Sequence, residues 1–389
     1  MMLINVPGMP MSTKKLSNHI AQVELFDHHT HGVWIETPTE EMFTFQMTES
    51  DRQPETLEQG MEAQLGFAIR AWCAPILDLP AHADSRTYFA RRTELGGEEV
   101  NRRFLTSAGI SDFGVDTGYR GDEIYTEKGM AQISGRAAYK VTRLEAVAEI
   151  VLSEGTSPQD FISDYRVKLQ SEAVGAIGLK SIIAYRYGLD FDPTRPSDQE
   201  VQAAAALLLE DFNATGAIRI ADPVLLRHFL YEGMDLNLPI QFHVGYGDPD
   251  LLLHRCDPLL MTDFIRVAEQ RNIPIMLLHC YPFHRNAGYL AQMFRNVYLD
   301  VGLAINYTGA QSSQIIAESF ELAPFNKILF SSDAWGLSDL TYLGAKLFRV
   351  EIEKLFGRWV SEGHWSQDDA IRVINLVAYE NARNVYGTH

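Results

Sequence analysis

Cysteine is scarce in this 389-residue sequence, and its scarcity argues against two kinds of site. The three cysteines, Cys73, Cys256 and Cys280, are too few and too scattered for a disulfide framework. They form no Cys-x-x-Cys pair, so a zinc site built from thiolates has no support. A chain of this kind suits a reducing compartment, and we expect a cytoplasmic protein.

Positive charge and long apolar runs are scarce as well. The formal net charge is −18 and no Lys/Arg-rich run occurs, which disfavours nucleic acid as a partner. No segment reaches the ~18 consecutive apolar residues of a membrane span, and residues 1–17 lack the apolar core of a signal peptide. We therefore expect a small-molecule substrate and neither a membrane nor a nucleic-acid partner.

The composition is that of an ordinary globular chain, with 46% hydrophobic and 22% charged residues. One large α/β barrel accounts for the length without a second domain. We expect residues 1–22 to be an N-terminal extension and residues 23–389 to form the barrel. Residues 33–110 are predicted to be a helical insertion after the first strand, in which Gly96 and Gly97 separate two helical stretches.

Apolar, β-branched runs alternate with helical patterns, most clearly from Ala173 onward. This alternation predicts parallel strands joined by right-handed crossovers, in a (β/α)8 TIM barrel of the α/β class that ends with C-terminal helices. The expected strands cover residues 23–26, 111–116, 140–144, 176–183, 238–243, 273–279, 297–301 and 327–332. The expected helices of the second half cover residues 199–212, 223–233, 258–270, 286–294 and, after a capping box that begins at Ser366, 370–377.

A histidine-rich segment, Asp-His-His-Thr-His at residues 27–31, follows the first apolar run. Because side chains alternate along a strand, we expect Asp27, His29 and His31 on one face and His28 on the other. Two imidazoles on one face are able to hold a metal ion, and Asp27 is a candidate to orient them. Taken alone, the segment favours a hydrogen-bonded histidine pair over a metal site.

Polar residues recur at the ends of the later apolar strands. Lys180 lies in the fourth expected strand, and His243 and His279 end the fifth and the sixth. Asp333 follows the eighth. A core histidine or a helix cap is the ordinary alternative for each, but an unpaired Lys180 would be costly to bury. In a (β/α)8 barrel the C-terminal strand ends meet at one mouth, so these residues and the first-strand histidines together favour a metal site.

This arrangement resembles the amidohydrolase superfamily, and its sequence motifs are most similar to those of the amidohydrolase-2 branch. It is similar to the N-terminal domain of fungal glutamine-synthetase fusion proteins, although no glutamine synthetase domain follows, so we expect a free-standing relative. The resemblance covers roughly residues 23–387. The matching segments are Asp27–Gly32, Gly178–Arg186, Leu278–Phe283, Asn296–Gly302 and Ser331–Ala334.

The resemblance implies a divalent metal, zinc by expectation, with one or two ions per chain. The ligands from strands one and eight would hold an inner ion and the two later histidines an outer one. Lys180, if carboxylated, would bridge two ions; unmodified, it would pair with a substrate carboxylate beside a single ion. Asp333 would take a proton from the attacking water and deliver it to the leaving nitrogen. The implied ligands are His29, His31, Lys180, His243, His279 and Asp333.

The implied reaction is hydrolysis of an amide-type, non-peptide C–N bond in a small carboxylate-bearing substrate, for example one of γ-glutamyl type. The alternatives are a non-oxidative decarboxylase with one metal ion and a non-catalytic binding barrel. Barrels of this type are often dimers, so a homo-oligomer is a further alternative to a monomer. Each substrate-binding candidate has an ordinary structural alternative, such as an ion pair, a turn or core packing. These candidates are Arg186, Tyr185, Arg143 (with Glu145 nearby), Asp248 and Trp335.

Overall fold

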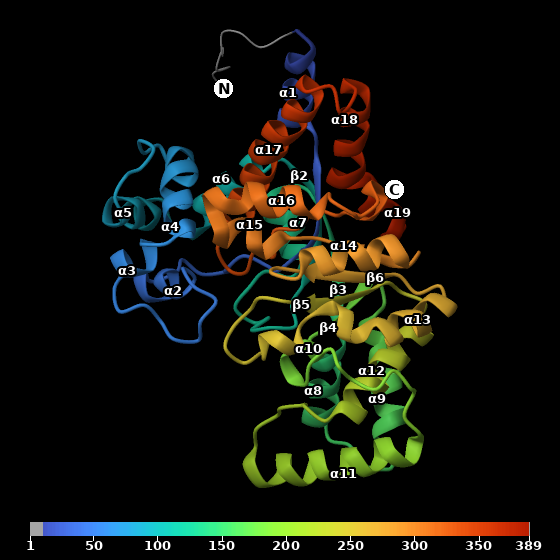
Figure 1. Cartoon of the computed structure of the whole chain (residues 1–389). Coiled ribbons are helices and arrows are strands. Elements are labelled where there is room, and N and C mark those ends of the chain that lie inside the picture. The colour runs from blue at the N-terminus through green and yellow to red at the C-terminus, as the bar shows by residue number, and fades with distance from the viewer. Residues whose placement is uncertain (1–10, 389) are drawn as a thin grey trace.

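A parallel sheet lies at the centre of the computed structural model, which describes residues 11–388 (Figure 1). Its seven strands pair in chain order, each parallel to the next, and most of their residues are buried except in β3, as expected for a sheet covered by helices. The strands lie within a few residues of their predicted positions. They are β1 (Leu25–Thr30), β2 (Ile110–Asp116), β3 (Ala137–Arg143), β4 (Ala176–Ser181), β5 (Ile240–Val244), β6 (Ile275–His279) and β7 (Val297–Leu299).

The eighth expected strand, residues 327–332, is not a regular strand, and this prediction is wrong in that respect. The segment nevertheless joins the last strand to the first through its backbone. The Leu329 N–H donates to the Leu299 carbonyl (2.9 Å), and the His28 N–H donates to the Phe330 carbonyl (3.1 Å). The segment forms too few ladder hydrogen bonds on either side to become a strand, yet it is held between β7 and β1.

Helices connect the strands and cover the outer face of the sheet, where the larger hydrophobic core lies. The predicted helices of the second half are confirmed within a few residues. The helices are α7 (Glu127–Ser134), α8 (Leu144–Glu154), α9 (Phe161–Glu172), α10 (Ile183–Arg186), α11 (Asp198–Thr215), α12 (Pro223–Asp235), α13 (Thr262–Gln270), α14 (His284–Met293), α15 (Gly302–Thr308) and α16 (Ser312–Ser319). None of the described helices is both long and apolar enough to span a membrane.

Between β1 and β2 the chain leaves the sheet and builds a group of short helices, seen at the left of Figure 1. They occupy the region predicted for the helical insertion. Gly96 has a φ of +79° and separates the last two helices, as its position in the sequence suggests. The helices are α2 (Glu40–Phe45), α3 (Leu57–Met61), α4 (Gln64–Ala68), α5 (Ser85–Leu95) and α6 (Gly97–Ser107).

The C-terminal helices pack against the N-terminal one, at the top of Figure 1. Of the expected extension 1–22, residues 1–10 lie outside the described residues, and the rest form α1. The predicted cap Ser366 accepts a hydrogen bond from the Asp369 N–H, so the helix begins just after it. The helices are α1 (Met11–Gln22), α17 (Ser338–Ser361), α18 (Gln367–Asn375) and α19 (Asn381–Tyr386).

A second, smaller core fills the inside of the curled sheet below the strand ends. Side chains from several strands form it, and α19 closes it from beneath with Ala382 and Tyr386. Because this floor is apolar and dry, any polar group that lies directly above it must find its partners inside the protein. The strand members are Phe26, Val141, Ile177, Met276, Leu278 and the nearby Leu329.

A buried ion pair anchors the inserted helices to α17. Arg92 of α5 donates two hydrogen bonds to Asp339 at the start of α17 (3.1 and 2.7 Å), and Tyr88 donates a third. The side chains of Arg92 and Asp339 are 4% and 0% exposed. The pair therefore ties the insertion to the helix that follows Asp333.

We predict that Arg92→Met lowers the free energy of unfolding by about 3–5 kcal/mol, because it leaves the buried Asp339 carboxylate without its counter-charge. Urea unfolding followed by circular dichroism measures the change. Arg102→Met is the matched control, since Arg102 pairs with Glu99 on the exposed face of α6. Similar losses in the two variants would contradict an anchoring role for the Arg92–Asp339 pair.

Candidate metal centre

β1 carries the first-strand histidines, but the expected alternation of faces fails there. Its pairing with β2 changes register between Asp27 and Thr30, which marks a bulge. His28 faces the barrel interior in step with Phe26: its ring contacts Asp300 (3.0 Å) and lies over the apolar floor. The bulge brings His29 to the same side, where it contacts Gln241. The prediction that His28 lies on the opposite face is wrong, because a bulge resets the two-residue period.

Asp27 also has a different role from the expected one. Its carboxylate accepts hydrogen bonds from the N–H (2.8 Å) and the hydroxyl (2.5 Å) of Ser332, not from an imidazole side chain. Burial raises the pKa of Asp27 to about 7. Asp27 thus fixes the backbone immediately before Asp333 and positions that carboxylate instead of orienting the histidine rings.

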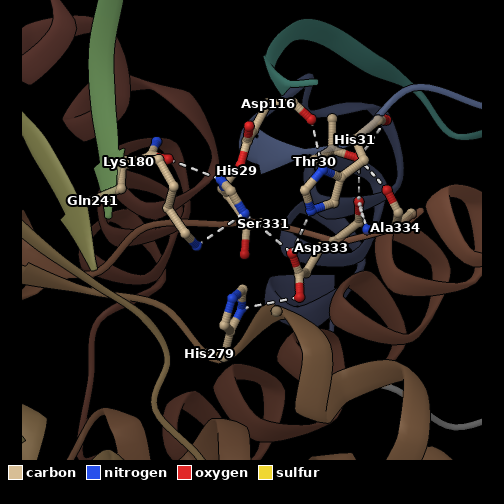
Figure 2. A network of polar contacts seen from close by, with 12 residues as sticks. His29, Thr30, His31, Asp116, Lys180, Gln241, His279, Ser331, Asp333 and Ala334 are labelled. Atoms are coloured by element: carbon tan, nitrogen blue, oxygen red, sulfur yellow. Dashed lines mark hydrogen bonds and ion pairs between the residues drawn. The ribbon is translucent and has the colours of Figure 1, made fainter. Parts of the chain in front are cut away.

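His29, His31 and Asp333 form a compact cluster at the strand ends (Figure 2). Asp333 Oδ1 lies 3.1 Å from His29 Nε2 and 3.7 Å from His31 Nε2. One ligand atom from each residue lies within 4.8 Å of the other two, a spacing that permits a shared cation. The structure therefore brings together the three residues expected around an inner ion.

Hydrogen bonds on the far side of each ring set which nitrogen faces the cluster. His29 Nδ1 donates to Gln241 Oε1 (2.8 Å), and His31 Nδ1 donates to the Asp116 carbonyl (2.6 Å). Their Nε2 atoms therefore carry the lone pairs. Burial lowers the pKa of His31 to about 4 and that of His29 well below its usual value. Both rings are neutral near pH 7, as metal ligation requires.

His279 and His243 extend the cluster on the other side of Asp333. His279 Nδ1 lies 3.4 Å from Asp333 Oδ2, and the His243 and His279 ring centres are 4.8 Å apart. Burial is also the largest cause that lowers the pKa of both imidazoles well below the usual value. Backbone strain accompanies the arrangement, since φ is +67° at His279 and +50° at Asp333.

The donor set fits a divalent metal. His243 Nε2 and His279 Nδ1 are buried without a hydrogen-bond partner among the described residues. An unsatisfied buried nitrogen costs about 1–3 kcal/mol, and such groups call for a specific explanation. Neutral imidazoles and one carboxylate are ligands that zinc and related cations prefer.

Lys180 is 2% exposed and lies beside the cluster, with Nζ 3.4 Å from His29 Nε2. No carboxylate of residues 11–388 comes within ion-pair distance of its amine. Burial lowers the pKa of Lys180 to about 8. Burial also raises the pKa of Asp333 well above its usual value, and the positive charge of Lys180 opposes that shift. The amine therefore loses its proton more easily than an ordinary lysine.

A cavity of about 270 Å³ opens above these groups. A larger surface groove, of about 1090 Å³, lies between the insertion and α17, but the candidate ligands do not line it. All five residues proposed to bind substrate line the smaller cavity. Its lining includes the candidate ligands His31, Lys180, His243, His279 and Asp333, and the substrate candidates Arg143, Tyr185, Arg186, Asp248 and Trp335.

Two arginines lie on the wall of this cavity with different partners. Arg186 bonds Asp250 through Nη1 (3.0 Å), while its buried Nε has no partner among the described residues. Arg143 forms two hydrogen bonds with Asp116 (3.1 and 2.6 Å). An ion pair, the ordinary alternative for Arg143, therefore forms with Asp116 at the end of β2 and not with the nearby Glu145.

The aromatic candidates wall the cavity. Tyr185 packs on the ring of His243, with centroids 4.4 Å apart. Trp335 packs edge-on against Trp34 (5.4 Å) and donates its indole N–H to the Tyr119 carbonyl (3.2 Å). Both side chains fix the shape of the cavity next to the candidate ligands.

Several residues of the site are absent from the sequence-based prediction. Asp116 and Asp300 follow the second and seventh strands, so the strand-end rule applied to Asp333 would have found them. Gln241 precedes His243 by two residues and shares its face of β5. Glu49 enters the cavity from the loop after α2, for which no pattern in the sequence gave a signal.

Comparisons with known proteins agree with this geometry. Residues 198–388 match the Amidohydrolase family model Amidohydro_2. A solved structure from Lactobacillus casei ATCC 334, named as a metal-dependent hydrolase, has a TM-score of 0.83 and 28% identity, over 96% of this chain and 97% of that one. The resemblance to the amidohydrolase family is confirmed. This family implies a divalent metal, and the expected α/β barrel class is confirmed too.

Two further comparisons limit what the resemblance to the amidohydrolase family says about the reaction. Protein fluG of Emericella nidulans is 29% identical over 285 residues, 66% of this chain and 33% of that protein, so the chain spans about a third of its length. A uronate isomerase from Bacillus halodurans C-125 has a TM-score of 0.66 at 13% identity, over 98% of each chain. The latter shares the fold alone, and a fold shared with isomerases does not decide the reaction.

We predict that His31 contributes a loss of stability to the metal-free protein as the pH falls from about 6.5 toward 4, against the opposite contribution of Asp27 and Asp333, whose pKa values are raised. The unfolded chain binds a proton at His31 in this range, whereas the folded state, with its lowered pKa, does not. Urea unfolding at a series of pH values measures the effect. His31→Gln should flatten the profile by up to about 1.4 kcal/mol per pH unit. The exposed His364→Gln is the control, and equal profiles in both variants would contradict the prediction.

Proposed function

We propose that this protein is a metal-dependent hydrolase that cleaves an amide-type, non-peptide C–N bond in a small carboxylate-bearing substrate. The observation that carries the proposal is the convergence of neutral imidazoles on Asp333 at the base of a cavity, where two buried ring nitrogens have no hydrogen-bond partner within residues 11–388. Six candidate ligands come from five segments of the barrel. Such a costly arrangement of buried polar groups is typical of a functional site.

His29, His31 and Asp333 would hold one ion, and His279 and His243 offer ligands for a second. Zinc or a similar cation, when bound, polarises a carbonyl group and acidifies water. Asp333 accepts the proton of the attacking water and then delivers it to the leaving nitrogen. Burial raises the pKa of Asp333, which makes the carboxyl group a better proton carrier between the water and the leaving nitrogen.

The number of ions depends on whether Lys180 is carboxylated. Its buried amine has a lowered pKa, which favours the neutral form that reacts with carbon dioxide to give a carbamate. The carbamate would add a carboxylate between the two groups of ligands. An unmodified ammonium would instead attract a substrate carboxylate beside one ion, and non-oxidative decarboxylation is then the second candidate reaction.

The cavity supports a small, anionic substrate. Its volume of about 270 Å³ lies near the lower end of ligand sites, about 300 Å³. Arg186 lines it, and guanidinium groups suit carboxylates. Glu49 and Asp248 line it as well, and burial raises the pKa of both carboxyls. Anionic and cationic walls together favour a substrate that carries more than one polar group.

We predict that strong chelation abolishes hydrolysis of small amides and that zinc or manganese restores it. Asp333→Asn should lower kcat by at least about 100-fold, because general acid–base catalysis typically contributes 10²–10⁴-fold. A panel of carboxylate-bearing amides, followed by release of the amine, provides the assay. Activity that survives chelation unchanged would contradict the proposal, and metal binding without turnover of any substrate class would favour a binding barrel.

We predict that Arg186→Leu raises KM for a carboxylate-bearing amide at least tenfold with little change in kcat, since hydrogen bonds to charged groups contribute about 1.5–3 kcal/mol. Arg219→Leu is the matched control. Arg219 binds the same Asp250 carboxylate (2.9 and 3.0 Å) but does not line the cavity. Equal effects of the two substitutions would show that both act through Asp250 alone and would contradict substrate binding by Arg186.

A further inference from the structure

A buried chain of hydrogen bonds runs beneath the candidate ligands, and a tyrosine from α19 lies in the middle of it. Tyr386 is 8% exposed, and its ring packs against Phe26 in the apolar floor (centroids 6.1 Å apart). Its hydroxyl is the part of α19 that enters the polar layer above. There it contacts Gln241 Nε2 (2.8 Å) and His28 Nδ1 (2.9 Å).

The direction of each hydrogen bond follows from the groups involved. The Gln241 amide nitrogen faces two acceptors, the His28 carbonyl (2.9 Å) and the Tyr386 hydroxyl. Its oxygen therefore faces His29 Nδ1, which must carry the proton. Since a carbonyl only accepts, the amide cannot turn over without placing its oxygen against the His28 carbonyl. The orientation of Gln241 thus sets the tautomer of His29.

A second series of hydrogen bonds leads from Tyr386 to His279. The Tyr386 hydroxyl donates to His28 Nδ1, and His28 Nε2–H then donates to Asp300 Oδ2 (3.0 Å). The other oxygen of Asp300 accepts from the His279 backbone N–H (3.0 Å). Burial opposes ionisation of Asp300, but the bond from His28 and further donors outweigh it and lower its pKa. A charged acceptor thus holds the strained backbone at His279.

We propose that Tyr386 is a positioning residue of the metal centre: its hydroxyl holds Gln241 in the orientation that presents His29 Nε2 to the metal. The inference rests on the proposed function, because it assumes that His29 is a ligand. It makes α19, which lies beneath the barrel and touches no candidate ligand in the described network, a determinant of metal affinity. Residues that orient metal ligands typically change affinity or activity 10–100-fold when substituted.

Tyr386→Phe removes the hydroxyl and keeps the ring in the floor. We expect it to weaken zinc binding about tenfold, because Gln241 then loses one of two acceptors and His28 Nδ1 loses its donor. Tyr379→Phe is the matched control, since the Tyr379 hydroxyl contacts only Glu380 (3.4 Å) in the described structure. Affinity is measured by competition with a chromophoric chelator, and the visible spectrum of the cobalt-loaded protein reports ligand geometry.

A double-mutant cycle separates positioning from packing. If Tyr386 acts through Gln241, then Gln241→Met weakens zinc binding at least as much as Tyr386→Phe, and the loss in the double variant is smaller than the sum of the two single losses. Thermal unfolding of the metal-free variants checks that each is folded at the temperature of the titration. Gln241→Met also tests the link to His29 if Tyr386→Phe proves unstable, because the amide lies above the floor.

The outcomes distinguish this inference from the proposed function. Zinc binding by the unaltered protein with an unchanged affinity and cobalt spectrum in Tyr386→Phe overturns the inference alone. Fully additive losses in the double variant overturn it too. Failure of the unaltered protein to bind zinc or cobalt overturns the proposed function and the inference with it. A tenfold loss in Tyr386→Phe, absent in Tyr379→Phe and non-additive with Gln241→Met, supports it.

Discussion

The burial of the Asp333 carboxylate among imidazoles and an amine is the constraint on which the rest of the site depends. The side chains of His29, His31, His279 and Asp333 are at most 11% exposed, so most of their polar atoms must find a partner in the protein or in a bound ligand. Desolvation keeps the imidazoles neutral and makes Asp333 hold its proton more strongly. The same environment that costs folding stability thereby prepares the groups for cation binding and proton transfer.

Residues outside the cluster hold the candidate ligands in place through hydrogen bonds and packing. Asp27 holds Ser332 and so the backbone before Asp333, while Gln241 and the Asp116 carbonyl hold the two first-strand rings. Below them, α19 closes the barrel and adds the hydroxyl of Tyr386. The inserted helices are pinned through Arg92 to α17, close in sequence to Asp333. Segments far apart in the chain thus converge on one carboxylate.

Much of the fold and of the candidate site could be predicted from the sequence, because apolar runs mark the strands and the candidate ligands lie at the ends of these runs. The alternation of strands and helices predicted the barrel, and polar residues at strand ends predicted Lys180, His243, His279 and Asp333 at one mouth. The predictions that failed concern places where a strand departs from regular geometry. The bulge in β1 breaks the two-residue period after Asp27, so His28 and His29 both face the barrel interior, and the eighth segment lacks a full ladder. Tertiary packing alone sets the position of the loop that brings Glu49 to the cavity.

The most direct test of the account is an anomalous diffraction measurement at the zinc edge on crystals grown with zinc. The account predicts a strong peak about 2.0–2.2 Å from the Nε2 atoms of His29 and His31 and from a carboxylate oxygen of Asp333. A second peak, with density for a carbamate extending from Lys180, would establish two ions. Absence of any anomalous peak within coordination distance of Asp333 at full zinc saturation would contradict the central claim.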